Sequence, residues 1–411
     1  MIYEPPIERL ELGARDRFLL TLDHPEVVAH WRDCLFVAHG RRERLTRAAA
    51  GLLPGRLGGR LLLHRAPEPA TAAAWPLLAT LADGGALLRR ARLDERRTLG
   101  WSFLTDYPAA GRGGGVAFLF DGAARPRVVL KLRRTGAGVP PLRREWETLE
   151  ALCDRLPAPL QPSVPFPLAY REEAGLEVLA TSWIPGRSSY VELHAALVPA
   201  LRLAAHLVPA AEWLAAFQRV TRARRGGPAP AEEAEELLAA LPQAWEGDRS
   251  RRMGWTDRLH ALERIPMLAR GAAHGDFWAR NVLAGGPRPH GVGVVDWEAY
   301  REDAPPWRDL FHFPLSHALN YPWGPSYRRL PPPAALRRAF LGRGALTRQV
   351  GRYFARWAAA AGVPREALAP LLHLELLDRS RREAGGGGGE GDPWIDLHRR
   401  LARADRSVFS G

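Results

Sequence analysis

The sequence has little of four residue types. Its 411 residues include one lysine, two asparagines, two cysteines and three methionines. The two cysteines, Cys34 and Cys153, lie far apart and match no metal-binding spacing, which argues against a disulfide framework and against a cysteine-rich zinc site. Two lone thiols suit a reducing compartment, so we expect a cytoplasmic protein.

Long apolar runs are also missing. No stretch of 18 or more apolar residues occurs, so we expect no membrane-spanning helix and no membrane partner. The first residues, MIYEPPIERLELGARDRFLL, lack a basic start followed by an apolar segment. We therefore expect no secretory signal.

Basic residues are abundant but dispersed. The formal net charge is +13, and all but one of the 58 basic residues are arginines. These arginines are scattered along the chain, with no basic tail and no basic block interleaved with aromatic residues, so we expect no nucleic-acid partner. The richness in Ala, Gly, Pro and Arg, together with the scarcity of Lys and Asn, is typical of a GC-rich genome.

The order of the patterns predicts an α+β fold. Short β-rich runs separated by glycine and proline, GWSFLTDY, GVAFLFDG and PRVVLKLRR, indicate an antiparallel sheet. A helix follows with apolar residues at helical spacing: Leu142, Trp146, Leu149 and Leu152. FPLAYREEAGLEVLATSWIPG predicts a hairpin that turns near Gly175, and from about residue 190 the chain is mostly helical, interrupted by the buried strand GVGVVDWE.

We therefore divide the chain into three segments. Residues 1–98 form an N-terminal α/β accessory segment to which the sequence assigns no role. Residues 99–186 form a small sheet-rich lobe and a connector, and residues 187–411 form a larger helical lobe. This last segment holds the residues most suited to chemistry.

Three polar residues follow one another in HGDFWARN and VVDWE. Asp276 and Asn281 are five residues apart on a loop between apolar segments, and Asp296 follows a strand fifteen residues later. Carboxylate and amide oxygens are ligands that Mg²⁺ accepts beside substrate phosphates. A carboxylate next to a substrate hydroxyl can also accept its proton while a phosphoryl group is transferred.

The pattern H-G-D-x4-N followed by D-W-E resembles the aminoglycoside phosphotransferase and choline kinase family. The resemblance covers roughly residues 99–380. It implies a bilobal protein-kinase-like fold with ATP between the lobes, Asp276 as catalytic base, and Asn281 and Asp296 as Mg²⁺ ligands. Protein kinases carry H-R-D and D-F-G at the corresponding places, which this chain does not.

The same resemblance implies a nucleotide site in residues 99–186. Lys131, in VVLK, matches the strand lysine that contacts ATP phosphates and pairs with a helix glutamate. Glu145, in RREWETL, is the best match for that partner, and Glu147 is the alternative.

Two further segments match the parts of the family that hold the nucleotide. GRGGGVAF would contact phosphates through Gly113 and Gly114, although Val116 replaces the last glycine of the full signature, and an ordinary hairpin turn is the alternative. LATSWIPG would bind adenine through the backbone near Ser182 and Trp183, unless it is only a strand end.

The scarcity of Lys and Asn supports two of these assignments without any family resemblance. A composition bias has removed nearly every other lysine, yet Lys131 remains. An ammonium is compact, whereas a guanidinium is a wide planar fork that does not replace it between a carboxylate and phosphates. Asn281 likewise provides a neutral oxygen ligand on a side chain of fixed length, which another residue type would not reproduce. Asn320, the second asparagine, has no assigned role.

Several neighbouring residues have alternative roles. We expect His274 to pack the loop rather than carry a proton, because Asp276 already fills the role of base. Asp309, in WRDLFHF, either braces the catalytic loop or caps a helix. The aromatic residues near the site, such as Phe277 and Trp297, are expected to lie mostly in the core.

The sequence therefore predicts an ATP- and Mg²⁺-dependent kinase acting on a hydroxyl group of a small molecule. The strongly basic chain favours a neutral or anionic acceptor, such as a sugar or a metabolic intermediate, over a polycation. An aminoglycoside antibiotic kinase, a nucleotide-binding regulator without turnover and an independent N-terminal binding module remain as alternatives. The sequence does not determine the identity of the phosphate acceptor, the preference for ATP or GTP, or the oligomeric state.

Overall fold

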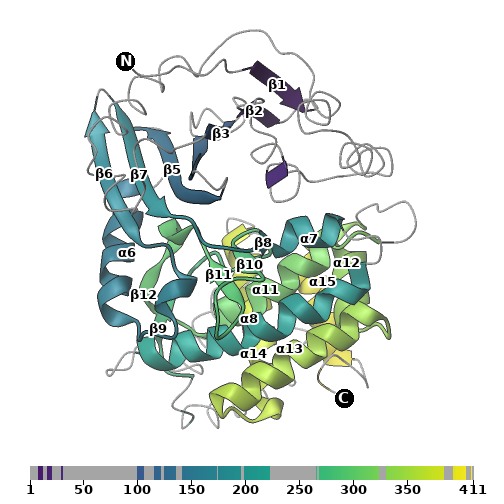
Figure 1. Ribbon diagram of the computed structural model, residues 1–411. Coiled ribbons are helices and arrows are strands. Elements are labelled where there is room, and N and C mark those ends of the chain that lie inside the picture. Colours follow the sequence, from purple (N-terminus) through teal and green to yellow (C-terminus); the bar gives the residue numbers. More distant parts are fainter. Residues whose placement is uncertain are drawn as a thin grey trace, which may run out of the picture. The chain divides into compact units, whose positions relative to one another are not determined.

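The structure is a computed structural model that describes residues 8–12, 16–20, 29–30, 100–105, 115–121, 125–135, 141–173, 175–195, 199–222, 265, 268–323, 330–383, 392–403 and 409. The chain divides into two compact units (Figure 1). Unit 1 consists of Met1–Asp154 and Val164–Pro185, and unit 2 consists of Arg155–Ser163 and Gly186–Gly411. A sheet-rich unit and a helix-rich unit confirm the predicted α+β class.

Unit 1 contains a seven-stranded antiparallel sheet with the order β1-β2-β3-β4-β5-β7-β6. The three β-rich runs predicted from the sequence form β3, β4 and β5. The strands are β1 (Glu8–Leu12), β2 (Asp16–Leu20), β3 (Gly100–Thr105), β4 (Gly115–Phe120), β5 (Pro126–Arg134), β6 (Pro167–Glu173) and β7 (Leu176–Ser182).

Two strands of the N-terminal segment belong to this same sheet. β2 pairs with β3 in antiparallel register, with Phe18 opposite Leu104, and β1 pairs with β2. The remainder of residues 1–98, apart from residues 29 and 30, lies outside the described residues, and a separate role for the segment stays a prediction.

Helix α6 (Leu142–Arg155) follows β5, as the apolar spacing predicted. Leu142, Leu149 and Leu152 are buried, whereas Trp146 is only half-buried. The neighbouring residue Glu145 is buried instead, with 1% of its surface exposed. A carboxylate is stable there only with a partner.

The hairpin between β6 and β7 also forms as predicted. Gly175 lies in the turn with φ +78°, a left-handed conformation that glycine adopts without steric cost. Glu177, near the start of β7, accepts hydrogen bonds from the backbone N–H groups of Leu142 (3.2 Å) and Arg143 (3.4 Å). A carboxylate at the N-terminus of a helix satisfies donors that have no partner within the helix. The hairpin thereby fixes the start of α6.

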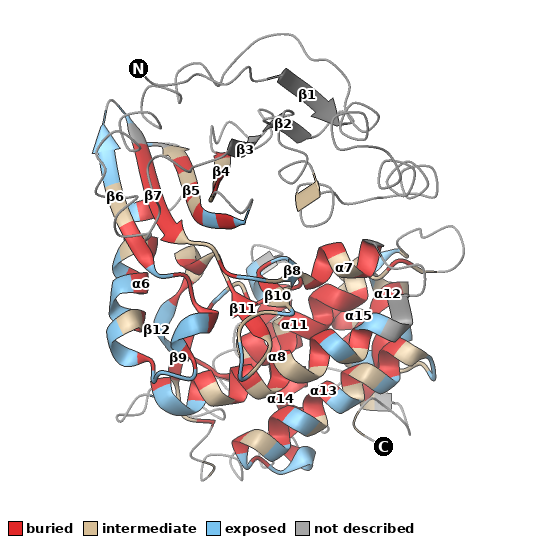
Figure 2. Cartoon of the chain, in the orientation of Figure 1, coloured by how far each residue is buried: buried red, intermediate tan, exposed pale blue. Residues whose placement is uncertain are grey.

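Unit 2 is built mainly from helices, and its buried residues line the sides on which they face one another (Figure 2). α8 packs against α13, and α11 lies among α8, α12 and α14. The helical run predicted after residue 190 is divided into α7 and α8. The helices are α7 (Ser189–Ala195), α8 (Pro199–Thr221), α11 (Trp307–Asn320), α12 (Pro332–Phe340), α13 (Ala345–Ala361), α14 (Leu368–Glu383) and α15 (Pro393–Arg403).

Short strands cross this helical unit and hold its central loop. β9 (Gly271–Ala273) pairs with β12 (Arg301–Ala304), and β10 (Val282–Ala284) pairs with β8 (Arg187–Ser188) and β11 (Val292–Val294). β11 is the buried apolar strand that the sequence predicted. None of the helices in the described ranges is long and apolar enough to span a membrane.

Candidate active site

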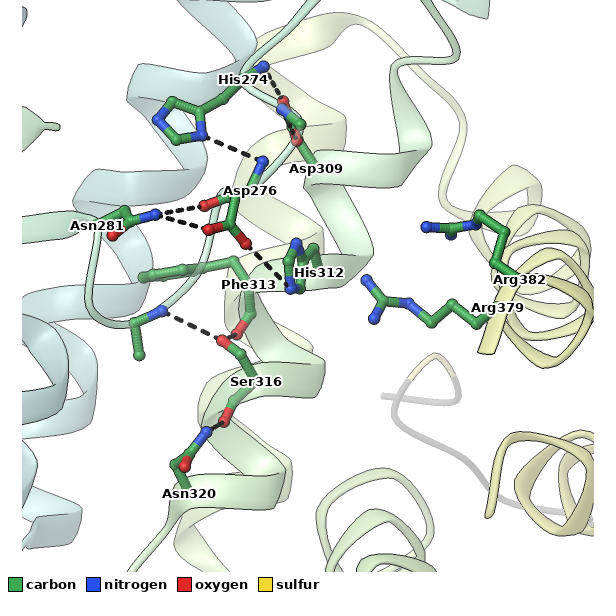
Figure 3. Close-up of polar contacts among 12 residues, drawn as sticks. His274, Asp276, Asn281, Asp309, His312, Phe313, Ser316, Asn320, Arg379 and Arg382 are labelled. Carbon is green, nitrogen blue, oxygen red and sulfur yellow. Dashed lines mark hydrogen bonds and ion pairs between the residues drawn. The ribbon is translucent and has the colours of Figure 1, made fainter. Parts of the chain in front are cut away.

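The loop between β9 and β10 carries His274, Asp276 and Asn281, and it is anchored by the helix that follows later in the chain. Asp309, in the first turn of α11, accepts hydrogen bonds from the backbone N–H of His274 (Oδ2, 2.6 Å) and of Gly275 (Oδ1, 3.1 Å) (Figure 3). Asp309 is 1% exposed, and burial raises its pKa to about 7 although both hydrogen bonds oppose the shift. Of its two predicted roles, the geometry matches bracing of the loop.

Gly275 allows the loop to pack closely against the backbone of Ala299. Its φ is +83°, and a Cβ at this position would lie 2.1 Å from the carbonyl oxygen of Ala299. Ala299 belongs to the short helix η7 (Trp297–Ala299) that follows Asp296. A side chain would therefore force the loop away from η7, which explains the glycine between His274 and Asp276.

His274 is held as a neutral ring within the loop. The backbone N–H of Asp276 donates to Nδ1 (3.2 Å), so Nε2 carries the proton and donates to the carbonyl of Val295 (3.0 Å). The ring is fully buried, and its centroid lies 4.6 Å from that of Trp297 in an edge-on contact. This geometry matches the expected packing role, because neither ring nitrogen is left for proton transfer.

Asp276 has two carboxylate oxygens in different surroundings. Oδ2 accepts a hydrogen bond from Nδ2 of Asn281 (3.0 Å), which also donates to the backbone carbonyl of Asp276 (3.0 Å). Oδ1 faces His312 on α11, with Nε2 at 4.0 Å. The side chain is 41% exposed, so a bound molecule can reach the carboxylate.

The hairpin register brings Asn281 and Asp296 together. Val282 lies opposite Val294, and the N–H of Val295 donates to the carbonyl of Asn281 (2.9 Å). Both polar residues therefore come to the same end of the hairpin. Asp296 has φ +70°, the one non-glycine residue with a positive φ among those the structure describes. Such a conformation costs roughly 1–2 kcal/mol, and this kind of strain is concentrated at functional sites.

The charges around Asp276 alter its proton affinity. Burial, followed by the negative charge of Asp296, raises the pKa of Asp276 to about 6, while the Asn281 hydrogen bond and Arg379 act in the opposite direction. The pKa of His312 lies well below its ordinary value because of burial and the nearby positive charges of Arg379 and Arg382. His312 is therefore neutral at pH 7.

Unit 1 contains the other predicted pair. Nζ of Lys131 lies 2.7 Å and 2.8 Å from the two carboxylate oxygens of Glu145, whereas Glu147 is exposed. The structure thus pairs the single lysine with Glu145 rather than with Glu147. Because Glu177 fixes the start of α6, it also positions Glu145, a contribution that no local pattern in the sequence revealed.

Adenine binding through the backbone near Ser182 and Trp183 stays a prediction, and the structure shows which backbone groups there already have partners. The N–H of Ser182 donates to the carbonyl of Phe166 (2.8 Å), and the N–H of Trp183 donates to the carbonyl of Arg127 (2.9 Å). These donors are already occupied, so a base at this position would have to use carbonyl groups. Gly113 and Gly114 lie outside the described residues, and their phosphate contact stays a prediction.

Four residues near Asp276 were not identified from the sequence. His312 and Ser316 lie on α11, and the hydroxyl of Ser316 accepts a hydrogen bond from the N–H of Ala279 in the loop (3.2 Å). Arg379 and Arg382 lie on α14 (Figure 3). The helical spacing of His312 and Ser316 from Asp309 could have indicated them, but the two arginines are about a hundred residues from the loop and carry no local signal.

Residues 110–340 match the family described as the phosphotransferase enzyme family. No curated protein matches the chain. Among solved structures, an aminoglycoside phosphotransferase from Streptomyces rimosus is 18% identical, with 75% of this chain and 99% of that chain covered and a TM-score of 0.41. A glucosamine kinase is 17% identical, with 82% of each chain covered and a TM-score of 0.38.

Proposed function

Because the chain belongs to the phosphotransferase enzyme family, we propose that it transfers the terminal phosphoryl group of ATP to a hydroxyl group of a small molecule, with Mg²⁺ as cofactor. One observation carries the proposal. The Asp276 carboxylate accepts a hydrogen bond through Oδ2, has a partly exposed side chain, and has a pKa raised to about 6. A base with a pKa just below the working pH is ionised and still accepts a proton readily.

The residues present fit a magnesium ion. Nδ2 of Asn281 donates to Asp276, and its Oδ1 has no hydrogen-bond partner in the described ranges, so this neutral oxygen is available as a ligand. Asp296, at the same end of the hairpin, offers a carboxylate. No group of three or more His, Cys, Asp or Glu residues suited to a metal occurs in the described part of the chain. Mg²⁺ needs no such cage, since it uses one or two protein oxygens together with phosphates and water.

When bound, Mg²⁺ would neutralise charge on the transferred phosphoryl group. Asn281 and Asp296 would hold it, and Lys131 would contact the nucleotide phosphates while Glu145 fixes the position of its ammonium group. Asp276 orients the acceptor hydroxyl and takes its proton at Oδ1. His274 and Asp309 contact no substrate in this mechanism and only hold the loop.

Transfer of radiolabelled γ-phosphate from ATP to pooled sugars, amino alcohols and aminoglycosides tests the proposal. The expected result is a labelled small molecule that requires Mg²⁺. In the Asp276→Asn variant, turnover should fall by about 10²–10⁴, while nucleotide binding measured by calorimetry stays near that of the parent. Nucleotide binding without transfer to any acceptor would instead identify a regulator without turnover. Near-normal turnover in Asp276→Asn would remove Asp276 from the role of base.

A further inference from the structure

Two arginine side chains extend from α14 toward the catalytic loop. Figure 3 shows the guanidinium groups of Arg379 and Arg382 directed at His312, on the side of Asp276 opposite to Asn281. The charge of Arg379 acts on both Asp276 and His312, and that of Arg382 acts on His312. These arginines therefore lie on the side of Asp276 that Oδ1 faces.

Arg379 is buried with part of its hydrogen-bonding capacity unused. The residue is 8% exposed, and its Nε donates to Oε1 of Glu375 (2.6 Å). Its guanidinium lies over the ring of Trp394, with Cζ 5.2 Å from the ring centroid. The two terminal nitrogens have no hydrogen-bond partner in the part of the chain that the structure describes. These two nitrogens are not among the buried polar atoms without a partner, so they reach the solvent and can donate charge-assisted hydrogen bonds to a bound anion.

The surrounding ion pairs do not neutralise this part of α14. The side chains of four arginines surround two buried carboxylates, Glu375 and Asp378. The arginines are Arg308, Arg379, Arg381 and Arg382. Positive charge is therefore in excess. Nε of Arg382 forms an ion pair with Oδ2 of Asp378 (2.9 Å), and the Arg382 side chain is 46% exposed, so an incoming ligand can contact it.

We propose that the hydroxyl acceptor carries an anionic group, a carboxylate or a phosphate, which Arg379 and Arg382 bind while Asp276 contacts the hydroxyl. The inference rests on the proposed phosphotransferase function. Planar guanidinium groups bind carboxylates and phosphates through two parallel hydrogen bonds, which would orient the acceptor as well as attract it. A polycationic acceptor would meet like charges at the same place and bind poorly.

Matched acceptors test this charge preference with the full-length protein. One set is glycerol, glycerate, glycerol 3-phosphate and ethanolamine, and a second is glucose, glucuronate, glucose 6-phosphate and glucosamine. Comparing the carboxylate with the phosphate in each set distinguishes the two anionic groups. For the preferred anionic acceptor, Arg382→Gln should lower kcat/KM by about 10- to 100-fold, because it removes a charge-assisted hydrogen bond. For the neutral acceptor, the change should stay within about threefold.

Arg400→Gln is the matched control. Arg400 on α15 has the same side-chain exposure as Arg382, 46%, and pairs with Asp396 at the same i to i+4 spacing. It should leave kcat/KM unchanged for every acceptor. Arg379→Gln is made together with Glu375→Gln, so that no lone carboxylate remains buried, and circular dichroism establishes that this double variant folds.

The outcomes separate the two proposals. Absence of transfer to every acceptor would contradict the phosphotransferase function itself. Transfer to neutral or cationic acceptors in preference to anionic ones, with Arg382→Gln behaving like Arg400→Gln, would overturn the anionic acceptor alone. An equal loss for all acceptors in Arg382→Gln would also overturn it, because the arginine would then act on the transferred phosphoryl group.

Discussion

The anchor beneath the catalytic loop gives a prediction whose size follows from the geometry. Asp309 is 1% exposed and accepts one N–H on each carboxylate oxygen. The amide of Asp309→Asn has only one acceptor oxygen, so its NH₂ group must face one of the two N–H donors. One buried donor then loses its partner, which should destabilise the protein by about 1–3 kcal/mol.

The pH dependence of this loss can be worked out. Burial raises the pKa of Asp309 from 3.8 to about 7, so the folded state binds the proton more tightly than the unfolded state. Stability from this group is therefore full below pH 3.8 and declines as the pH rises toward 7. Between pH 5 and pH 7 the parent should lose about 2 kcal/mol through Asp309, at roughly 1.4 kcal/mol per pH unit. The Asp309→Asn variant has no titrating group here and does not lose this stability. The difference in unfolding free energy between parent and variant should therefore shrink as the pH rises.

Urea unfolding of parent and variant at pH 5, 6, 7 and 8 measures the deficit. Asp396→Asn is the control, because Asp396 also lies in the first turn of a helix but makes an exposed pair with Arg400. A deficit that stays constant or grows with pH would refute the reasoning, since Asp309 would then be ionised throughout. Turnover in Asp309→Asn should fall by about 100-fold, because a small displacement of the loop misplaces Asp276.

Three further predictions concern the proposed chemistry. The parent's kcat/KM should fall about tenfold per pH unit below pH 6, because Asp276 must be ionised to act as base; half-maximal activity near pH 4 would contradict its raised pKa. Asp296→Ala should abolish Mg²⁺-dependent nucleotide binding in calorimetry, and unchanged binding would remove it from the metal site. Lys131→Arg and Glu145→Gln should each impair turnover at saturating ATP, and their combination should cost less than the sum, because both break one unit. Full turnover in Lys131→Arg would refute the argument from the single lysine.

Features encoded in short segments were predictable. Glycine and proline between short apolar runs predicted β3, β4 and β5, and the segment from His274 to Asp296 predicted the loop and the buried strand β11, whereas the pairing of β11 with β10 was not predicted. The buried face of α6 was predicted except at one place, where Trp146 was expected inside and Glu145 is buried instead. Hydrophobic spacing does not indicate a buried carboxylate whose partner, Lys131, comes from a neighbouring strand.

Features that depend on packing between distant segments were not predictable. Glu375 and Asp378 on α14 are buried and paired with arginines, and no local pattern in the sequence predicted this. Which side of α14 faces the catalytic loop depends on how α14 packs against α11. The charge around Asp276 was therefore inaccessible from the sequence, although it is the feature that bears on the acceptor.

Asn320, the second asparagine, tests the inference that rare residue types remain only where the chemistry requires them. Nδ2 of Asn320 donates to the carbonyl of Ser316 (2.8 Å) near the C-terminal end of α11. The hydroxyl of Ser316 in turn accepts from the N–H of Ala279 in the catalytic loop. Asn320 thus lies two hydrogen bonds from the loop that holds Asn281, and its side chain gives the Ser316 carbonyl a second donor (Figure 3). A composition bias therefore retains residues that support a site as well as those that belong to it, so survival alone does not distinguish a ligand from its scaffold.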